Sequence, residues 1–444
     1  MAKIAPQTRV SGECRLIQPV LPNVRSPLKG PALRECRCIE PGKLIMQLFN
    51  PRVGFVFFPH LPETTRLDTM PFAAHIITKL VSSGCHVDVF HWSKLNSYNH
   101  IGFPAENVRY KYVRTYSTKN IMKFIELTVR FAGCMHYKCV FSVGLIGSYI
   151  GGVISAASRC PFVLLNDEFP SMYGQSRWLP LERWAARRAA AIVVPSDDRH
   201  TTLKDELRLN IDKPFVTIRN TPELELPLPQ IDWHQRMGIP SGKRIFIHAG
   251  SVADWAQVPE ILSSVSYWPA DAVLLIHNSR TQDELMRYRR QLSHLDNPER
   301  VFWNSKLLSE NMLNSLISYC RGSFALYRNF GPNIEQTGTS SGKLMRSIVC
   351  CTPVITSAFA SLNFVTREGL GIQVKHPSEI PAAVDNLMRN RESYEKRCAF
   401  FAISEKALRE DAWNTILRLI RCASHCADLF PSAGEKCLKS LRSS

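Results

Sequence analysis

The chain has 444 residues, 45% of them hydrophobic, and a formal net charge of +17 at pH 7. This length and apolar content are typical of a globular protein with two or three domains, and they exclude a small scaffold held by disulfides. The positive charge predicts an anionic partner, which is a nucleic acid, an acidic lipid surface or a phosphorylated ligand.

The 14 cysteines are scattered, and several lie in apolar contexts. Their spacing lacks the paired cysteines and histidines of a zinc site, so we expect no metal. Buried thiols indicate a reducing compartment, and we therefore expect a cytoplasmic protein. No uninterrupted apolar run of about 18 residues occurs, so we expect no transmembrane helix.

Residues 1–45 are basic and rich in proline, which predicts a mobile extension. From Arg52 onward, apolar runs of strand length alternate with segments of helix length. Residues 53–59 are typical of a strand buried on both faces, and residues 71–84 carry helix start and stop signals. The other expected elements of this half are strands at 85–92, 139–147 and 161–167, a helix at 148–159, and a basic helix running into a strand at 180–196. This alternation predicts a doubly wound, Rossmann-like parallel sheet over residues 46–222.

Residues 223–243 contain several prolines and no periodicity, which indicates a linker between domains. A second α/β series follows at residues 244–421, and its last helices can cross back to the first domain. Its expected strands are 244–250, 272–279, 323–328 and 353–357, and its expected helices are 258–268, 281–295, 309–320, one after residue 340, and a pair near 379–421. Residues 422–444 form a basic tail. Two such α/β domains predict a ligand-binding cleft at the carboxyl ends of their strands.

The segment 118–138 places four basic side chains among apolar residues at helical spacing, namely Lys119, Lys123, Arg130 and Lys138. Such a face lies on anionic lipid in some proteins and is the solvated side of a core helix in others. An anionic membrane surface is therefore a candidate partner, which would place the protein peripherally at the inner face of the plasma membrane. We expect no nucleic-acid partner, because no recognition motif is present.

Three blocks of sequence, at residues 190–225, 236–252 and 343–374, resemble GT-B-fold glycosyltransferases of the retaining, nucleotide-sugar type (group 1, or family 4-like). The first block resembles the strand, "PS", helix and Asn-ending strand that close the N-terminal domain of that family. The second resembles the first strand and glycine turn of its C-terminal domain. The third resembles its "KLxEYLAxGxPVI" stretch and the strand after it.

The resemblance covers roughly residues 50–420. It implies two Rossmann-like domains facing a cleft, with the nucleotide sugar in the C-terminal domain and the acceptor in the N-terminal domain. It also implies hexosyl transfer with retention, with the nucleotide sugar as co-substrate and no cofactor or metal.

The stretch "TGTSSGK" is the candidate site for the donor diphosphate. Small residues at Ser340, Ser341 and Gly342 allow the backbone to approach a phosphate at a helix N-terminus, and Lys343 adds a positive charge. The alternative is an ordinary helix cap with Lys343 in solvent. A P-loop is not expected, because three residues rather than four separate Gly338 from Gly342.

Gly250 and Ser251 follow a predicted strand, and their backbone N–H groups are further candidates for the diphosphate. The alternative is that Gly250 only ends the strand.

The resemblance also implies an acidic pair that contacts the sugar and the ribose, and this sequence departs from it. When the sequence is aligned on "TPVI", Arg346 occupies the position of the second acid. When it is aligned on "FG", Arg328 occupies the position of the first acid, and Glu335 lies one residue before the position of the second. Arginine cannot accept hydrogen bonds from ribose but can bind phosphate. We therefore assign Arg328 and Arg346 to binding of the phosphate, and we take Glu335 as the surviving acid. The alternative is that the donor site is changed or lost.

Asp167 and Glu168 end a buried strand, and we name them as candidates to orient the acceptor or assist proton transfer. The alternative is a pair of capping acids. His60, Thr65 and Arg66 follow the first strand and are candidates for acceptor binding.

The sequence therefore predicts a glycosyltransferase that moves a hexosyl group onto a polysaccharide or a lipid-linked glycan. Two alternatives stay open. One is a catalytically silent relative that binds a glycan or a partner, and the other is a sugar-nucleotide epimerase of the same fold.

Overall fold

The structure is a computed structural model, and it describes residues 52–57, 71–93, 107–114, 125–126, 137–173, 179–210, 212–278 and 282–429. The predicted extension at 1–45 lies outside these residues, as does nearly all of the segment 118–138. Of the basic tail predicted at 422–444, residues 422–429 continue the last helix and residues 430–444 lie outside the described ranges. None of the helices in the described ranges combines the length and the hydropathy needed to cross a bilayer.

The first half of the chain forms a seven-stranded sheet in the order β3-β2-β1-β4-β5-β6-β7, and every pairing in it is parallel. Its strands are β1 (Arg52–Phe57), β2 (His86–Ser93), β3 (Val108–Arg114), β4 (Cys139–Val143), β5 (Phe162–Leu165), β6 (Ala191–Val194) and β7 (Phe215–Thr217). Its helices are α2 (Pro71–Ser82), α4 (Leu145–Ser158), α5 (Leu179–Arg188) and α6 (His200–Leu207). Phe55 and Phe57 enter one core and Val56 enters another, because successive side chains of a strand point to opposite faces.

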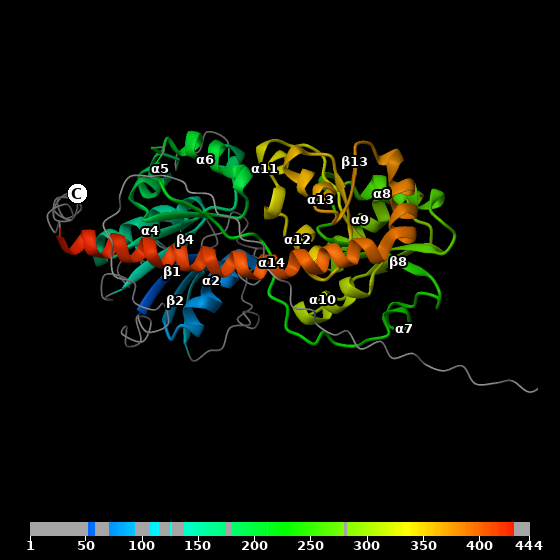
Figure 1. Ribbon diagram of the computed structural model, residues 1–444, viewed down its shortest axis with the longest axis horizontal. Helices are drawn as coiled ribbons and strands as arrows, with labels where there is room; N and C mark the ends of the chain where they lie inside the picture. The colour runs from blue at the N-terminus through cyan, green and yellow to red at the C-terminus, as the bar shows by residue number, and fades with distance from the viewer. Residues whose placement is uncertain are drawn as a thin grey trace, which may run out of the picture. The chain divides into compact units, whose positions relative to one another are not determined.

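The second half forms a six-stranded parallel sheet in the order β10-β9-β8-β11-β12-β13. Its strands are β8 (Arg244–Gly250), β9 (Ala272–Asn278), β10 (Val301–Asn304), β11 (Gly322–Ala325), β12 (Val354–Ser357) and β13 (Gly371–Val374). Its helices are α7 (Trp233–Met237), α8 (Val258–Ser264), α9 (Gln282–Gln291), α10 (Glu310–Tyr319), α11 (Pro332–Glu335), α12 (Gly342–Val349), α13 (Asn363–Arg367) and α14 (Ile380–Leu429). The predicted fold class, two doubly wound parallel sheets, is confirmed (Figure 1).

The Pro-rich stretch 223–243 is not extended throughout, because it contains α7. The side chain of Trp233 in α7 is fully buried in a core that includes Ile245 and Ile247 of β8. Its Nε1 donates to Ser315 Oγ at 3.0 Å. This part of the stretch therefore packs against the second sheet.

Helix α14 contacts both halves of the chain (Figure 1). Its first turns pack Ile380 and Val384 into the core of the second sheet, and its later turns pack Trp413 and Ile416 into the core of the first. Asn390 interrupts the helical backbone between them, with φ −113° and ψ 16°. The predicted pair of C-terminal helices is thus present as two helical segments of α14 that join at a kink at Asn390.

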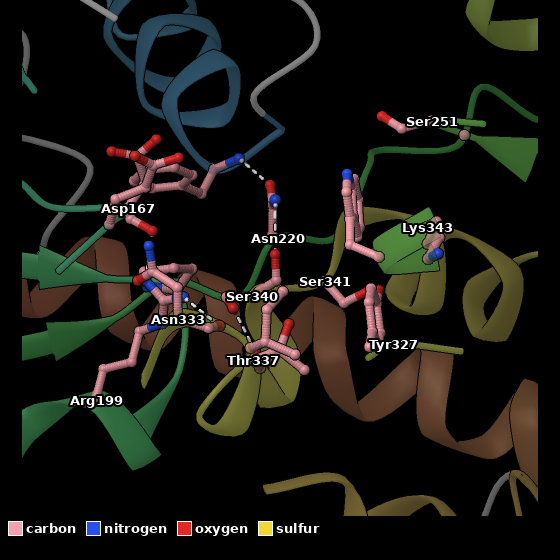
Figure 2. Close-up of a pocket in the computed structure, with 17 residues that line it drawn as sticks. Asp167, Arg199, Asn220, Ser251, Tyr327, Asn333, Thr337, Ser340, Ser341 and Lys343 are labelled. Carbon is pink, nitrogen blue, oxygen red and sulfur yellow. Dashed lines mark hydrogen bonds between the residues drawn. The ribbon is translucent and has the colours of Figure 1, made fainter. Parts of the chain in front are cut away.

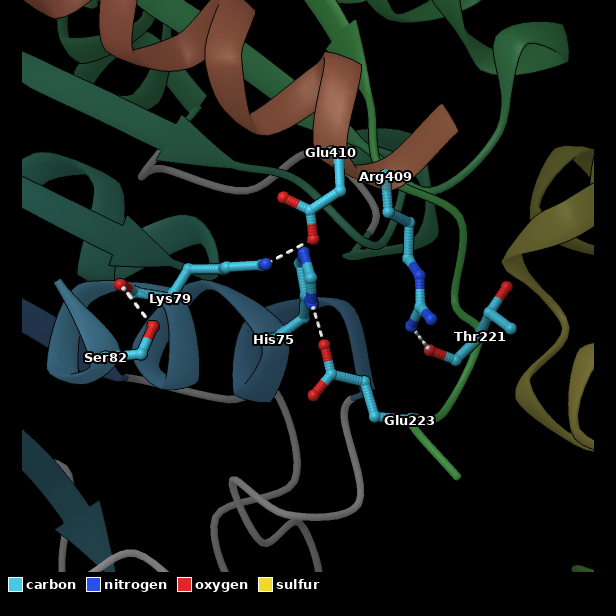
Figure 3. A network of polar contacts seen from close by, with 7 residues as sticks. All are labelled: His75, Lys79, Ser82, Thr221, Glu223, Arg409 and Glu410. Atoms are coloured by element: carbon cyan, nitrogen blue, oxygen red, sulfur yellow. Dashed lines mark hydrogen bonds and ion pairs between the residues drawn. The ribbon is translucent and has the colours of Figure 1, made fainter. Parts of the chain in front are cut away.

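The chain between the two sheets is tied to α2 and α14 by a network of polar contacts (Figure 3). His75 Nδ1 of α2 lies 2.7 Å from Glu223 Oε1, and Arg409 of α14 donates to the carbonyl of Thr221 at 2.9 Å. Lys79 and Glu410 pair directly between the two helices. These contacts fix the path of the chain where it leaves the first sheet.

Candidate functional site

A pocket of about 400 Å³ is lined by residues from both halves of the chain. Asp167 and Glu168 follow β5, Gly250 and Ser251 lie at the end of β8, and Lys343 lies in the first turn of α12. Figure 2 shows Asp167 and Arg199 on one side of the pocket and Ser251, Tyr327 and Lys343 on the other, with Asn220 and Ser340 between them. The carboxyl ends of parallel strands thus meet at the pocket, where open α/β sheets bind ligands.

The N-terminus of α12 reaches the pocket. The hydroxyl of Ser341 is the helix cap, since it accepts from the backbone N–H of Leu344 at 3.2 Å and also bonds to the hydroxyl of Tyr327. The Ser341 side chain is therefore engaged in holding the turn. What this turn can present to an anion is its backbone and the dipole of the helix.

The side chain of Lys343 lies in the pocket wall and not in bulk solvent. Part of its stem is exposed, but its Nζ atom is buried and has no hydrogen-bond partner among the described residues. Burial lowers the pKa of Lys343 to about 7. An anionic ligand in the pocket would therefore stabilise the charged form of this amino group.

The opposite wall carries the carboxyl groups. Burial, with a smaller contribution from neighbouring Glu168, raises the pKa of Asp167 to about 7. Behind them, Asn166 Nδ2 donates to Glu182 Oε1 at 3.4 Å, and burial raises the pKa of Glu182 to about 8. Asp167 thus changes its protonation state near neutral pH, which suits a group that accepts a proton.

The segment 333–340 of the second half is bonded directly to the first half. The guanidinium of Arg199 donates to the carbonyl oxygens of Asp167 and Asn333. Asn333 Oδ1 accepts from the backbone N–H of Phe169 at 2.9 Å, and Thr339 Oγ1 donates to the carbonyl of Pro195 at 2.8 Å. These bonds hold the two walls of the pocket together.

Asn220 links the starts of two helices at the pocket (Figure 2). Its Oδ1 accepts from the backbone N–H of Phe72 in α2 at 3.2 Å, and its Nδ2 donates to the carbonyl of Ser340 at 3.0 Å. A Cβ atom at Gly342 would lie 3.3 Å from the same Nδ2, so a larger residue at position 342 would crowd this amide. Asn220 therefore sets the spacing between α2 and α12.

Asn220→Ala is expected to lower the free energy of unfolding by about 1–3 kcal/mol, because it removes both bonds and leaves their partners unpaired. Urea unfolding would measure the loss. Asn210→Ala, a change at an exposed asparagine of the same half, is the control and should be close to neutral. Equal stability of the two variants would contradict the bridging role.

No family model matches the chain, and no curated protein matches its sequence. Solved structures do match its fold. Sucrose-phosphate synthase from Thermosynechococcus elongatus superposes with a TM-score of 0.64 at 14% identity, covering 84% of this chain and 100% of that one. HepE from Anabaena, in complex with UDP and glucose, gives a TM-score of 0.60 at 11% identity, covering 83% and 100%. WaaG, a glycosyltransferase involved in lipopolysaccharide biosynthesis, gives a TM-score of 0.57 at 12% identity, covering 81% of this chain and 98% of that one.

The chain has the GT-B fold. The sequence blocks predicted this fold, and the prediction is confirmed. In this GT-B chain the pocket described above lies where the two sheets' strand ends meet. Of the predicted site residues, it brings together Asp167, Glu168, Gly250, Ser251, Ser340, Ser341, Gly342 and Lys343.

Three other predicted residues do not line this pocket of the GT-B chain. Arg328 forms an ion pair with Glu260. Arg346 is largely buried, 2.6 Å from a carboxylate oxygen of Glu310 and 2.8 Å from Asn314 Oδ1. Glu335 accepts a hydrogen bond from Asn329 Nδ2.

Each of the two arginines is therefore already neutralised by a carboxylate of its own half, and the structure does not bring either one to the place predicted for the diphosphate. His60, Thr65 and Arg66 lie outside the described residues.

Sequence reasoning missed several pocket residues. Arg199, Asn333 and Thr337 line the pocket, and so do Trp255 and Tyr327. Two of the missed residues had a signal, namely Asn220, as the asparagine that ends the last strand before the linker, and Pro195, as the proline of the "PS" stretch. The described residues contain no cluster of three or more His, Cys, Asp or Glu that could hold a metal ion.

Proposed function

We propose that this chain transfers a glycosyl group from a nucleotide-diphosphate sugar to an acceptor hydroxyl. The observation that carries the proposal is the pocket itself. One wall has the buried amino group of Lys343 beside the N-terminus of α12, and the other has Asp167 and Glu168. Solved structures of the same fold support it, since HepE is described in complex with UDP-glucose.

On the donor side, transfer breaks the bond between the sugar and a diphosphate. Negative charge grows on the diphosphate in the transition state, and preorganised positive charge stabilises it. Lys343 and the dipole of α12 supply that charge, and the backbone of Gly250 and Ser251 lies at the same wall.

On the acceptor side, the attacking hydroxyl must be oriented and must lose its proton. We assign this step to Asp167, because a carboxylate with a pKa near the working pH is an efficient base. Glu168 lies beside it and is the second candidate to bind the acceptor.

For the finer specificity, we propose hexosyl transfer with retention onto a polysaccharide or a lipid-linked glycan. The sequence resemblance supports retention, which requires the acceptor hydroxyl to attack from the face of the sugar that the diphosphate leaves, so in this proposal Asp167 takes the proton from a hydroxyl held on that face. WaaG, which shares the fold, is described as acting in lipopolysaccharide biosynthesis, and the charge of +17 suits an anionic, membrane-associated acceptor. This acceptor would place the protein at the inner face of the plasma membrane.

The test begins with calorimetric titration of the full chain with UDP-, GDP-, ADP- and CDP-glucose, followed by product analysis with a panel of glycan acceptors. We expect one nucleotide to bind and its diphosphate to be released only when an acceptor is present. Conversion of the donor without acceptor would indicate an epimerase. Binding without any release would indicate a catalytically silent protein.

The pH profile tests the role of Asp167. The proton acceptor must be ionised, and its pKa is about 7, so kcat at saturating donor should rise as the pH increases through 7. Asp167→Asn should abolish this rise, whereas Asp205→Asn, a change on α6 away from the pocket, should leave it intact. An unchanged profile in Asp167→Asn would reject this assignment.

A further inference from the structure

Two aromatic rings stack beneath the start of α12. Trp255 and Tyr327 lie with their ring centroids 6.2 Å apart and an angle of 3° between the planes. Backbone bonds hold them together, since the N–H of Arg328 donates to the carbonyl of Trp255 at 2.8 Å. The side chain of Gln257 donates to the carbonyl of Tyr327 at 3.0 Å. We refer to Trp255 and Tyr327 as the aromatic platform, and both of its residues line the pocket.

The amino group of Lys343 rests on this platform. Its Nζ lies 4.3 Å from the centroid of the Tyr327 ring and 5.6 Å from that of the Trp255 ring, both within the range of cation–π attraction. The stem of Lys343 passes Gly250, where a Cβ atom would lie 3.6 Å from its Cδ. The Lys343 side chain is thus confined between the platform and the end of β8.

No carboxylate among the described residues pairs with this amino group. The titratable groups that face it are Tyr327 and His248 of β8. Burial, and then the charge of Lys343, lowers the pKa of His248 to about 3, so this histidine is neutral at pH 7. Across the pocket lie Asp167, Glu168 and Arg199.

An aromatic face attracts a cation without cancelling its charge, whereas a carboxylate would cancel it. The contrast with Arg328 and Arg346 is direct, because each of those cations is already paired with a glutamate. Of the two cations that line the pocket, Arg199 already donates to the carbonyl oxygens of Asp167 and Asn333, whereas the amino group of Lys343 has no hydrogen-bond partner among the described residues. The hydroxyl of Tyr327 is also hydrogen-bonded to the hydroxyl of Ser341, the cap of α12, so the aromatic platform is joined directly to the start of the helix.

We propose that Trp255 and Tyr327 are positioning residues that hold the amino group of Lys343, without a counter-ion, for the diphosphate of the donor. This inference rests on the proposed function, since it assigns the anion that Lys343 receives. A bound diphosphate supplies the missing negative charge and keeps the lysine protonated. The free protein binds the donor only in the fraction of molecules in which Lys343 carries its proton.

The pH dependence of binding follows from this arrangement. Burial lowers the pKa of Lys343 to about 7, so the ammonium form dominates below that pH and is lost above it. The affinity for UDP-glucose, whose diphosphate does not titrate in this range, should fall about fivefold between pH 7 and pH 8.

The experiment compares Trp255→Ala with Trp255→Phe in the full chain. We expect Trp255→Ala to admit water and release the lysine, which weakens UDP-glucose binding at pH 7 by about fivefold or more and removes its pH dependence. Trp255→Phe keeps an aromatic face and should behave like the wild type. Tyr267→Ala, at an exposed aromatic residue outside the pocket, is the control for general effects. Trp255→Leu, which retains apolar volume, replaces the alanine variant if that variant does not fold.

A second readout needs no nucleotide. NMR of lysine labelled at its side chain gives the titration midpoint of Lys343, assigned by its loss in Lys343→Arg. We expect a midpoint near 7 in the wild type and a rise toward the ordinary value of about 10.4 in Trp255→Ala. Wild-type binding and midpoint in Trp255→Ala would overturn the proposal, as would an ordinary midpoint in the wild type. If no nucleotide sugar binds but the midpoints behave as expected, the platform stands and the proposed function fails.

Discussion

Lys343→Met is expected to lower kcat/KM for the nucleotide sugar by about 100- to 1000-fold, the usual cost of removing one group that stabilises a charged leaving group. Methionine keeps the length and the apolar stem of lysine, so the packing against Tyr327 and Gly250 is retained. What it removes is the positive charge at the place where the diphosphate develops negative charge. Steady-state kinetics with the donor and acceptor found in the binding screen would measure the loss.

Two further variants make this result specific. Lys306→Met changes an exposed lysine in the same half of the chain and should leave kcat/KM within about twofold. Lys343→Arg keeps a charge but not the geometry of a single ammonium group, and it should recover part of the activity. Full activity in Lys343→Met would mean that the diphosphate binds elsewhere in the protein.

The start of α12 could be predicted from sequence because its signals are local. Small residues, a cap at Ser341 and a lysine stand within a few positions of each other, and the preceding strand sets the direction of the segment. The places of Arg328 and Arg346 could not be predicted in this way. Their partners, Glu260 and Glu310, lie tens of residues away in the chain, and only the folded sheet brings each pair together.

The same distinction explains the missing part of the pocket. Trp255 follows β8 and Tyr327 follows β11, and these strands are neighbours in the sheet although about 70 residues separate them in sequence. Arg199 and Asn333 meet across the two halves. Neither contact leaves a pattern in a single sequence, because side-chain periodicity reports burial within an element and not the identity of its neighbour.

The strands that neither the apolar periodicity nor the family resemblance predicted are β3 and β10, which are both edge strands. The central strands read as continuous apolar runs because both faces are buried. By contrast, β3 contains three basic residues among four apolar ones, and β10 has only four residues, two of them partly exposed. Basic side chains on an edge strand also discourage pairing with another chain. The basic residues that made β3 hard to predict from sequence are therefore typical of an edge strand.

Trp413→Ala is expected to lower the free energy of unfolding by about 3–5 kcal/mol, as deletion of a large buried aromatic side chain does. Trp413 is only 4% exposed and packs in the core of the first sheet, although its helix begins in the core of the second. The loss of stability should therefore be confined mainly to the first half of the chain. Hydrogen exchange should become faster in β1 and β4 than in β8 and β11, and urea unfolding would give the total.

Asn414→Ala is the matched control, because Asn414 is exposed on the next position of α14 and its replacement should change stability by less than about 0.5 kcal/mol. If Trp413→Ala unfolds in a single transition that weakens both sheets equally, the two halves fold as one unit. If only the first sheet loses protection, the later turns of α14 stabilise the first half without coupling its unfolding to that of the second half. An unchanged stability would contradict the packing of Trp413 and with it the path of α14 across the first sheet.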